Sequence, residues 1–260
     1  MGTPGRHERT DDWTDLAGWW FAEAADPAYQ EEVSPLFLQV LRPQRGHVLL
    51  DLGCGEGRIG EGLAAQGVRV VGVDVSLELA RLASDRHPVF LKRLPDLACV
   101  RDEAVDGAYA VLALEHFEDS GCFFAETARV TRAGGSLVVV INHPVYTAPG
   151  SGPVMDPSDG ELFWRFGEYL SPGRSREPAG DRSVEFIHRP VGTLLTQAAT
   201  AGWSLEAALE QGVGSRAASK DPILAQHGDI PHLMALRWLR RYPGPERCVP
   251  AARRPGSSNR

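Results

Sequence analysis

The sequence predicts an α/β fold in which helices cover both faces of a doubly wound, parallel sheet. Short apolar runs alternate with segments of helix-forming residues over positions 46–142 and again after 188. A glycine-rich turn directly follows the first apolar run. The length of 260 residues, of which 43% are hydrophobic, suits one domain with a full core and additions.

Residues 11–45 are expected to form a helical cap that precedes the sheet. Residues 1–10 are polar, and we expect them to be disordered. From position 11 to 41, apolar and aromatic residues recur among acidic ones in a pattern that predicts one or two helices. The aromatic residues Trp19, Trp20 and Tyr29 either cover the core or form part of a lid over a ligand.

The domain built on the sheet is expected to span residues 46–242. Its strands are predicted at 48–52, 69–73, 88–91, within 103–114, at 136–141 and at 203–210, and its helices at 58–65, 77–83, 122–131 and 191–201. Ser76 is a favourable N-cap for the second of these helices, and Gly67 suits the end of the first. Gly134 and Gly135 predict a turn before the fifth strand.

The alternation of strands and helices stops at residues 142–187. This stretch carries six prolines and many glycines, but also six aromatic residues. A loop of this length in a compact domain is usually functional or disordered, and its aromatic content argues against disorder. We therefore predict a substrate lid inserted after the fifth strand. Residues 243–260 are rich in Pro, Gly and Arg and are expected to form a flexible tail.

The composition limits the classes of partner. The net charge of −7 and the isoelectric point of about 5.6 disfavour binding to a nucleic-acid backbone. The four cysteines have neither metal-ligand nor disulfide spacing, which together with a polar N-terminus predicts a reduced, cytoplasmic protein. No segment is long and apolar enough to span a membrane, so no membrane partner is expected.

The stretch from Asp51 to Gly60 carries the clearest chemical signal. Its alternating glycines permit positive φ angles and a close approach of the backbone to a ligand. Gly55-x-Gly57-x-x-Gly60, with Asp74 about 20 residues later, also fits the dinucleotide-binding fingerprint. Asp51 argues against a dinucleotide, because its charge at the strand end would repel a pyrophosphate. A carboxylate there suits a ligand that carries an ammonium or sulfonium cation.

A family resemblance rests on two segments, Asp51-Leu52-Gly53-Cys54-Gly55-Glu56-Gly57 and Val71-Gly72-Val73-Asp74-Val75-Ser76. Both resemble the class I S-adenosylmethionine (SAM)-dependent methyltransferases. The resemblance implies a Rossmann-like, mostly parallel sheet of seven strands whose last strand is antiparallel, and residues 230–238 resemble that strand. It implies SAM as the cofactor, with the glycine loop at the methionine part and Asp74 at the ribose hydroxyls.

The resemblance also assigns contacts to the cofactor. The residues expected to bind SAM are Asp51, Gly53, Cys54, Gly55, Gly57, Asp74, Val75, Leu94, Ala113 and Leu114. Many relatives have an acid after the third strand that contacts the adenine, whereas this chain has Arg93 and Leu94, with Asp96 two residues later. Either Asp96 takes that role, or the backbone near Leu94 and apolar packing hold the adenine.

Methyl transfer from a sulfonium is an in-line displacement, to which a protein contributes mainly proximity and alignment. A base is needed where the acceptor must lose a proton, and histidine is the natural candidate because its pKa lies near neutrality. The candidates are His116, which follows the fourth strand, His143, which follows the fifth, and His188, which follows the lid. Each is either the base or a structural, hydrogen-bonding histidine.

Four residues in or next to the predicted lid are candidates for binding the acceptor, namely Tyr146, Trp164, Tyr169 and Arg189. The three aromatic residues either line a pocket for a planar or apolar acceptor or form the small core of the lid itself. Arg189 pairs either with an acidic group of the substrate or with a neighbouring carboxylate. The sequence shows no legible metal site, so no metal is expected.

The sequence therefore predicts a SAM-dependent methyltransferase that acts on a small molecule, with a secondary metabolite as one candidate. Two alternatives stay open, an NAD-dependent oxidoreductase on a Rossmann sheet and a non-methylating SAM-binding member of the same fold. Asp51 and the antiparallel-looking last strand count against the first of these. A regulatory module with a decayed site is a third alternative, against which the intact glycine loop argues.

Overall fold

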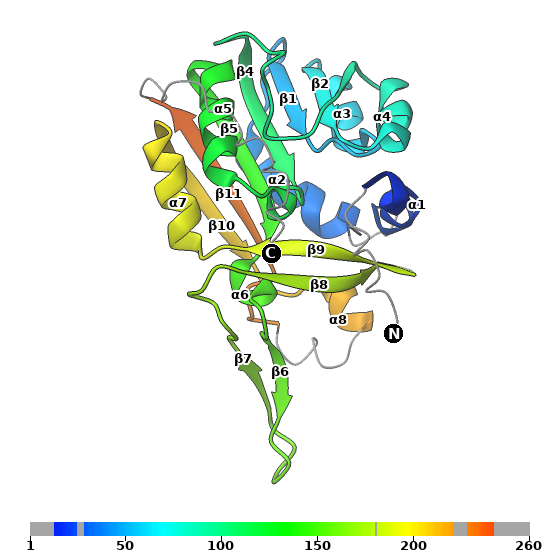
Figure 1. Cartoon of the computed structure of the whole chain (residues 1–260), viewed down its shortest axis with the longest axis vertical. Helices are drawn as coiled ribbons and strands as arrows, with labels where there is room; N and C mark the ends of the chain where they lie inside the picture. Colours follow the sequence, from blue (N-terminus) through cyan, green and yellow to red (C-terminus); the bar gives the residue numbers. More distant parts are fainter. Residues whose placement is uncertain (1–12, 25–28, 180, 221–227, 242–260) are drawn as a thin grey trace, which may run out of the picture.

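The computed structural model describes residues 13–24, 29–179, 181–220 and 228–241 (Figure 1). The two stretches expected to be disordered or flexible, 1–10 and 243–260, lie outside the described residues. A seven-stranded sheet forms the centre of the molecule, and two smaller two-stranded sheets accompany it.

The central sheet has the strand order β10-β11-β5-β4-β1-β2-β3. Its strands are β1 (Val48–Leu52), β2 (Arg69–Asp74), β3 (Val89–Leu91), β4 (Val105–Val111), β5 (Thr131–Asn142), β10 (Trp203–Gln211) and β11 (Leu233–Arg240). Strands β1 to β5 run parallel to their neighbours in that set, whereas β11 is antiparallel to both β5 and β10. The expected sheet with an antiparallel last strand is confirmed.

Helices cover both faces of the sheet. On one face, α5 (Ser120–Val130) and α7 (Val191–Thr200) pack over a core that includes Phe124 and Trp238. On the other face, α2 (Ser34–Leu41) and α3 (Arg58–Ala64) complete a second core, in which the ring of Phe37 lies 5.0 Å from that of Tyr109. Helix α4 (Leu77–Ser84) lies against β2 and β3. Because the sheet is covered on both sides, its central strands are continuous apolar runs.

Residues 142–187 do not form the irregular loop that the sequence suggested. They fold into a short helix, α6 (Pro144–Thr147), and two antiparallel hairpins, β6–β7 (Gly152–Met155 with Leu162–Arg165) and β8–β9 (Gly173–Ala179 with Arg182–His188). Two-stranded hairpins tolerate Pro153 and Pro178, since half of the backbone N–H groups of an edge strand face away from the partner strand. Hairpin β6–β7 projects from the molecule (Figure 1).

Hairpin β8–β9 packs against the N-terminal helix α1 (Trp13–Ala24). Leu16 of α1 forms a small separate core with Ala179 and Val184 of the hairpin, and Trp13 and Trp19 pack against it. The π-helical turn η1 (Tyr29–Val33) then leads from this region into α2. The N-terminal helix and the second half of the insertion therefore lie side by side, although about 160 residues separate them in the sequence.

Three local features differ from the predictions. The fifth strand begins at Thr131 rather than at 136, because a register shift between β4 and β5 absorbs the expected glycine turn within the strand. A short helix, α8 (Ser215–Lys220), lies in the polar connection before β11. Cys122 is disulfide-bonded, which the cysteine spacing did not predict, whereas Cys54 and Cys99 are free thiols.

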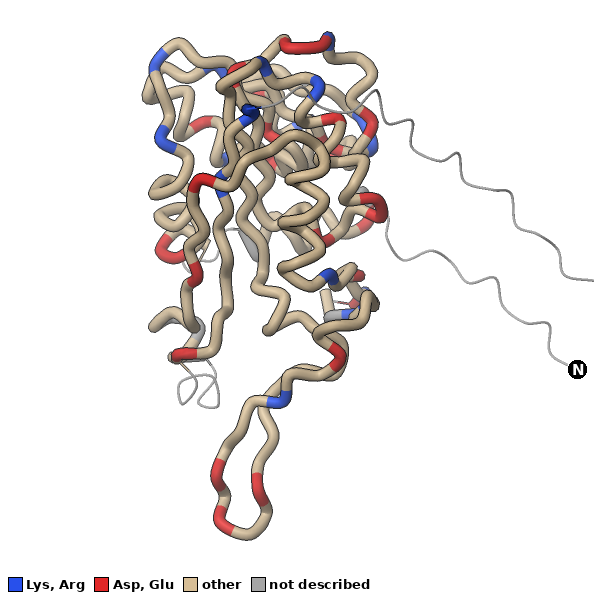
Figure 2. Tube along the Cα trace, turned by 90° about the vertical axis from the view of Figure 1, so that its left-hand side faces the viewer, with Lys and Arg blue, Asp and Glu red and all other residues tan. Residues whose placement is uncertain are grey.

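Charged residues of both signs are interspersed along the chain, with acidic ones around the tip of hairpin β6–β7 (Figure 2). Of the helices within the described ranges, none has the length and apolar character that crossing a membrane would require.

The glycine turn after β1 rests on His87, which is only 6% exposed. A Cβ atom at Gly57, Gly60 or Gly72 would lie 2.9, 2.4 or 2.9 Å from the nearest ring atom of His87. The ring donates its Nδ1–H to the carbonyl of Pro88 at 3.2 Å, which fixes its orientation. Gly60, the last glycine of the dinucleotide-like pattern, is thus required by packing and needs no phosphate to explain it.

This packing predicts opposite effects of the same substitution at two positions of α3. Gly60→Ala places a methyl group against His87 and is expected to lower the free energy of unfolding by about 1–3 kcal/mol. Gly62→Ala meets nothing within 4 Å and is expected to raise it by about 0.5–1 kcal/mol, because alanine is the better helix former. Urea unfolding followed by circular dichroism measures both changes. Equal effects of the two substitutions would contradict the role of His87.

Candidate active site

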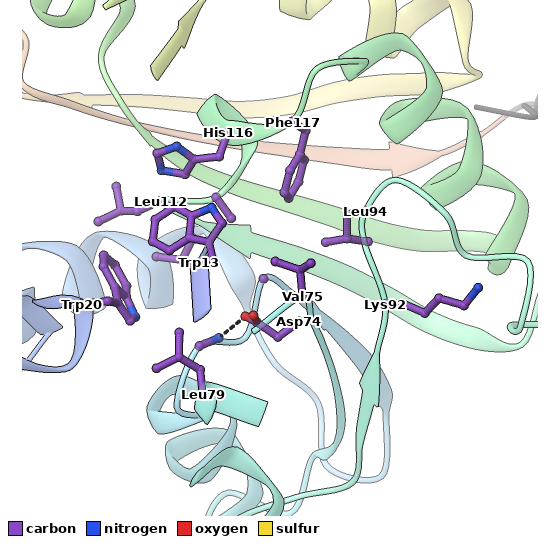
Figure 3. A pocket seen from close by; sticks show the side chains of 14 residues that line it. Trp13, Trp20, Asp74, Val75, Leu79, Lys92, Leu94, Leu112, His116 and Phe117 are labelled. Atoms are coloured by element: carbon purple, nitrogen blue, oxygen red, sulfur yellow. Dashed lines mark hydrogen bonds between the residues drawn. The ribbon is translucent and has the colours of Figure 1, made fainter. Parts of the chain in front are cut away.

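A cavity of about 520 Å³, here called the main cavity, opens at the carboxyl ends of β1, β2 and β4 (Figure 3). Parallel α/β sheets bind their ligands at this edge. The lining residues are Trp13, Trp20, Gly53, Gly55, Asp74, Val75, Leu79, Lys92, Leu94, Val111, Leu112, Ala113, His116 and Phe117. Six of the residues expected to bind SAM are among them, namely Gly53, Gly55, Asp74, Val75, Leu94 and Ala113.

Asp74 ends β2 and is 7% exposed. One carboxylate oxygen accepts the backbone N–H of Gly55 at 2.8 Å, drawn in Figure 3, and the other accepts that of Ser76 at 2.8 Å. Burial raises the pKa of Asp74, and the hydrogen bonds from the backbone of Ser76 and Gly55 oppose that rise. Each oxygen has a second lone-pair site with which it can accept a ligand hydroxyl.

The glycine turn is held between β4 and α1. Gly53, Gly55 and Gly57 have φ angles of 81°, 53° and 84°, a region that side chains rarely permit. A Cβ at Gly53 would lie 2.7 Å from the Cβ of Ala113, and one at Gly55 would lie 2.8 Å from Nε1 of Trp20. The absence of side chains therefore lets the turn approach both neighbours.

Asp51 lies in β1 beneath the turn and is 3% exposed. Among the described residues its hydrogen-bond donor is the hydroxyl of Tyr109, at 2.9 Å. Burial raises the pKa of Asp51 to about 8, opposed by the bond from Tyr109 and reinforced by the charges of Asp74 and Glu56. Asp51 lines a second space of about 290 Å³, the Asp51 hollow, which adjoins the main cavity at the glycine turn. A carboxyl in this setting favours a cationic ligand.

The other predicted cofactor contacts have different surroundings. Cys54 lines the Asp51 hollow, and Leu114 is a buried core residue. Of the two alternatives for the adenine, Leu94 lines the main cavity, whereas Asp96 pairs with Lys92 at 2.8 Å and accepts the N–H of Ala98 at 3.0 Å. The geometry therefore favours apolar packing near Leu94 over a contact with Asp96.

Helix α1 places aromatic side chains over the ligand spaces. Trp13 lines the main cavity, and Trp20 lines both the main cavity and the Asp51 hollow. Their rings are perpendicular, with centres 6.3 Å apart, and Trp20 also meets Tyr29 at 6.1 Å. Tyr29 lines the Asp51 hollow, whereas Trp19 packs toward hairpin β8–β9. The positions of Trp20 and Tyr29 fit the alternative in which they form part of a lid over a ligand. The position of Trp19 fits core packing.

His116 ends the short helix η2 (Leu114–His116) and lines the main cavity, as Figure 3 shows. Its Nδ1–H donates to the backbone carbonyl of Glu185 in β9 at 2.8 Å, so Nε2 carries the lone pair. Among the described residues no donor bonds to Nε2. The rings of Trp13 and Phe186 flank the imidazole at 4.8 and 4.9 Å. Burial lowers the pKa of His116 to about 4, so the ring is neutral at pH 7.

The two other candidate histidines lie outside the main cavity. His143 caps α6, where its Nδ1 accepts the N–H of Val145 at 3.1 Å and its Nε2–H donates to Glu210 at 2.9 Å. His188 is 2% exposed and donates from Nε2 to the carbonyl of Tyr169 at 2.8 Å. Both nitrogens of His143 are therefore occupied by structural hydrogen bonds.

The aromatic residues expected to bind the acceptor pack within the insertion. Tyr146 and Trp164 stack with ring centres 5.3 Å apart, and Tyr146 meets His232 edge-on at 4.5 Å. The hydroxyl of Tyr169 accepts the N–H of Val191 at 3.3 Å. Neither the main cavity nor the Asp51 hollow is lined by these three residues. Their contacts fit the alternative in which they form the small core of the insertion.

Arg189 fastens η2 to β9. Its guanidinium donates to the carbonyls of Leu114 and Ile187, each at 3.4 Å, to that of Glu118 at 3.0 Å and to that of Phe117. The N–H groups of the guanidinium thus donate to backbone carbonyls rather than to a neighbouring carboxylate. Arg189 therefore holds the turn that carries the candidate base.

Several site residues were not predicted. Trp13, Leu112 and Phe117 line the main cavity, although none of the three was among the residues expected to bind a ligand. Glu185 contributes its backbone carbonyl, which no side-chain pattern can reveal. Within the described part of the chain, no group of three or more His, Cys, Asp and Glu side chains could hold a metal ion.

Comparison with known proteins gives a consistent assignment. Residues 50–139 match the family model of a methyltransferase domain. The ubiquinone biosynthesis O-methyltransferase of Hahella chejuensis is 32% identical over 129 residues, which cover 46% of this chain and 54% of that protein. The chain spans about half the length of the curated relatives that it matches.

Solved structures extend the likeness over more of the chain. A SAM-dependent methyltransferase from Mesorhizobium loti is 26% identical with a TM-score of 0.64, over 75% of this chain and 92% of that one. The [4+2]-cyclase SpnF shares the fold, with a TM-score of 0.55 and 18% identity, over 83% of this chain and 82% of its own. The seven-stranded sheet and the match of residues 50–139 to a methyltransferase domain bear out the predicted resemblance to the class I SAM-dependent methyltransferases.

Proposed function

We propose that this protein transfers the methyl group of SAM to a small-molecule acceptor. The observation that carries the proposal is Asp51, a buried carboxyl with no ion pair among the described residues, next to the cavity lined by Asp74 and the glycine turn. The ammonium group of a methionine moiety would neutralise this carboxyl, whereas a pyrophosphate would be repelled by it. The match of residues 50–139 to a methyltransferase domain and the likeness to a solved SAM-dependent methyltransferase support the same cofactor.

The residues around the main cavity bind and orient the reactants. Asp74 accepts hydrogen bonds from the ribose hydroxyls, and Leu79, Leu94 and Phe117 offer apolar surfaces to the adenine. When bound, SAM supplies an electrophilic methyl group on a sulfonium. The protein aligns the acceptor for in-line displacement, and α1 with hairpin β8–β9 acts as the lid that excludes water. In this arrangement residues 11–45 are the cap, and the second half of the 142–187 insertion completes the lid.

His116 is the base where the acceptor must lose a proton. Its Nε2 has a free lone pair and its ring lines the main cavity, whereas the rings of His143 and His188 do not line it. A pKa of about 4 makes an isolated imidazole a weak base. The positive charge of the sulfonium, however, disappears in the same step in which the imidazolium forms. The net charge of the site is unchanged, and proton uptake becomes more favourable as the methyl group leaves.

The charge of the cofactor and the fate of SAM separate this proposal from its alternatives. An anionic dinucleotide would meet the carboxylates of Asp51 and Asp74 at the glycine turn. A non-methylating reaction on the same fold would leave SAM unconsumed, so detection of a methylated product distinguishes it. A secondary metabolite remains a candidate for the small molecule.

Replacing Asp74 tests the cofactor site. Asp74→Asn keeps one oxygen acceptor but loses the charge, and we expect it to weaken binding of S-adenosylhomocysteine (SAH) roughly tenfold to a hundredfold. The matched control is Asp96→Asn, which removes a carboxylate that does not line the main cavity and should leave the affinity unchanged. Calorimetric titration with SAH, and with NAD in parallel, measures the affinities of the wild-type protein and of both variants. Binding of NAD without SAH would overturn the proposed function.

The pH dependence of cofactor binding tests Asp51. The folded pKa of about 8 means that Asp51 is largely protonated at pH 6, whereas an ammonium ligand requires it ionised. We expect the affinity for SAH to rise roughly tenfold per pH unit from pH 6 to 8 and then to level off, with proton release on binding below pH 8. Asp51→Asn should abolish this dependence. If the affinity of the wild-type protein for SAH is constant from pH 6 to 8, Asp51 does not bind the ammonium group of the ligand.

A further inference from the structure

A further space, here called the acceptor chamber, lies beyond His116. Helix α1, the end of η2 and strand β9 enclose it, and α1 and β9 are neighbours in Figure 1. Its lining residues are Trp13, Leu16, His116, Glu118, Val184, Glu185 and Ile187. Trp13 and His116 line both the chamber and the main cavity, so the two spaces meet at these side chains.

The lining of the chamber disfavours an anionic acceptor. The side chains of Leu16, Val184 and Ile187 and the indole of Trp13 form the apolar part of its lining, which includes neither Lys nor Arg. The charged groups that it does contain are carboxylates. Glu185 bonds to Arg174, whose guanidinium also lies 3.3 Å from Glu118. An acceptor carboxylate would therefore lose its hydration without gaining a cationic partner.

A cationic acceptor is disfavoured for a different reason. The nucleophile must approach a sulfonium, and two like charges in a space of low dielectric repel strongly. A protonated amine also lacks the lone pair that forms the new bond. The reactive acceptor is thus neutral.

His116 identifies the polar group of that acceptor. The carbonyl of Glu185 binds Nδ1–H, so Nε2 can only accept a hydrogen bond. Trp13 and Phe186 on either side hold the ring in this orientation. A hydroxyl group next to an apolar, planar body satisfies both the acceptor nitrogen and the indole wall.

We propose that the acceptor chamber binds a neutral, planar molecule of the phenol class, with its ring against Trp13 and its hydroxyl hydrogen-bonded to Nε2 of His116. This proposal rests on the proposed function. In the reaction the hydroxyl oxygen forms the C–O bond to the methyl group, and the C–S bond breaks with its electron pair moving to sulfur. The sulfonium becomes a neutral thioether, and the hydroxyl proton passes to Nε2 and then to solvent.

Three probes of similar size and different charge test the acceptor class. Phenol, benzoate and benzylammonium are each titrated into the full-length protein with saturating SAH and followed by ligand-observed NMR. Phenol is expected to bind at least tenfold more tightly than either charged probe. Incubation with methyl-labelled SAM is expected to convert phenol to its methyl ether. Tighter binding of benzoate or benzylammonium, or binding of none of the three, overturns the phenol class.

Matched variants assign the effect to the chamber. Trp13→Ala should reduce phenol binding at least tenfold, whereas Phe21→Ala on the same helix should not, because that side chain is 47% exposed and lines neither space. His116→Asn removes Nε2 and should abolish methyl transfer while SAH still binds. Unchanged phenol binding in Trp13→Ala overturns the chamber assignment. A wild-type protein that does not bind SAH is a separate outcome, which overturns the proposed function itself.

Discussion

The burial of two carboxyl groups at the ends of neighbouring parallel strands is the constraint on which the site depends. Strands β1 and β2 pair with Asp51 opposite Gly72, so Asp51 and Asp74 reach the same edge of the sheet. Two backbone N–H groups satisfy Asp74, and one of them, from Gly55, is available because that glycine adopts a φ of 53°. Asp51 has only a hydroxyl partner, and an uncompensated buried charge is costly. A ligand cation would reduce this cost, so the same geometry that shapes the turn also selects the ligand.

The sheet and the cofactor half of the site could be predicted because short-range signals encode them. Strand β1 has the predicted bounds, and Ser76 caps α4 by accepting the N–H of Leu79, as its position suggested. The glycine turn and Asp74 lie within about 25 residues of each other and do line one cavity. Periodicity, caps and positive φ angles are local properties, which a single sequence carries.

The acceptor half could not be predicted, because distant partners decide the role of each residue there. The sequence offers three histidines in similar settings. His143 is occupied by Glu210, 67 residues away, whereas His116 is oriented by a carbonyl 69 residues away. The two hairpins within residues 142–187 were not predicted for the same reason, since prolines and glycines indicate a loop unless the pairing of the strands is known.

The division between the two halves has a functional consequence. The parallel strands and the glycine turn build the cofactor half, whereas α1, η2 and the insertion build the acceptor chamber. Arg189 ties two elements of the acceptor half together, because it bonds to carbonyls on both η2 and β9 and so keeps His116 against the carbonyl of Glu185. Changes in hairpin β8–β9 can therefore alter the shape and polarity of the chamber without disturbing Asp51 and Asp74, the carboxylates of the proposed cofactor site. The orientation of the base, by contrast, depends on that hairpin, so acceptor choice and proton transfer are coupled through the same strand.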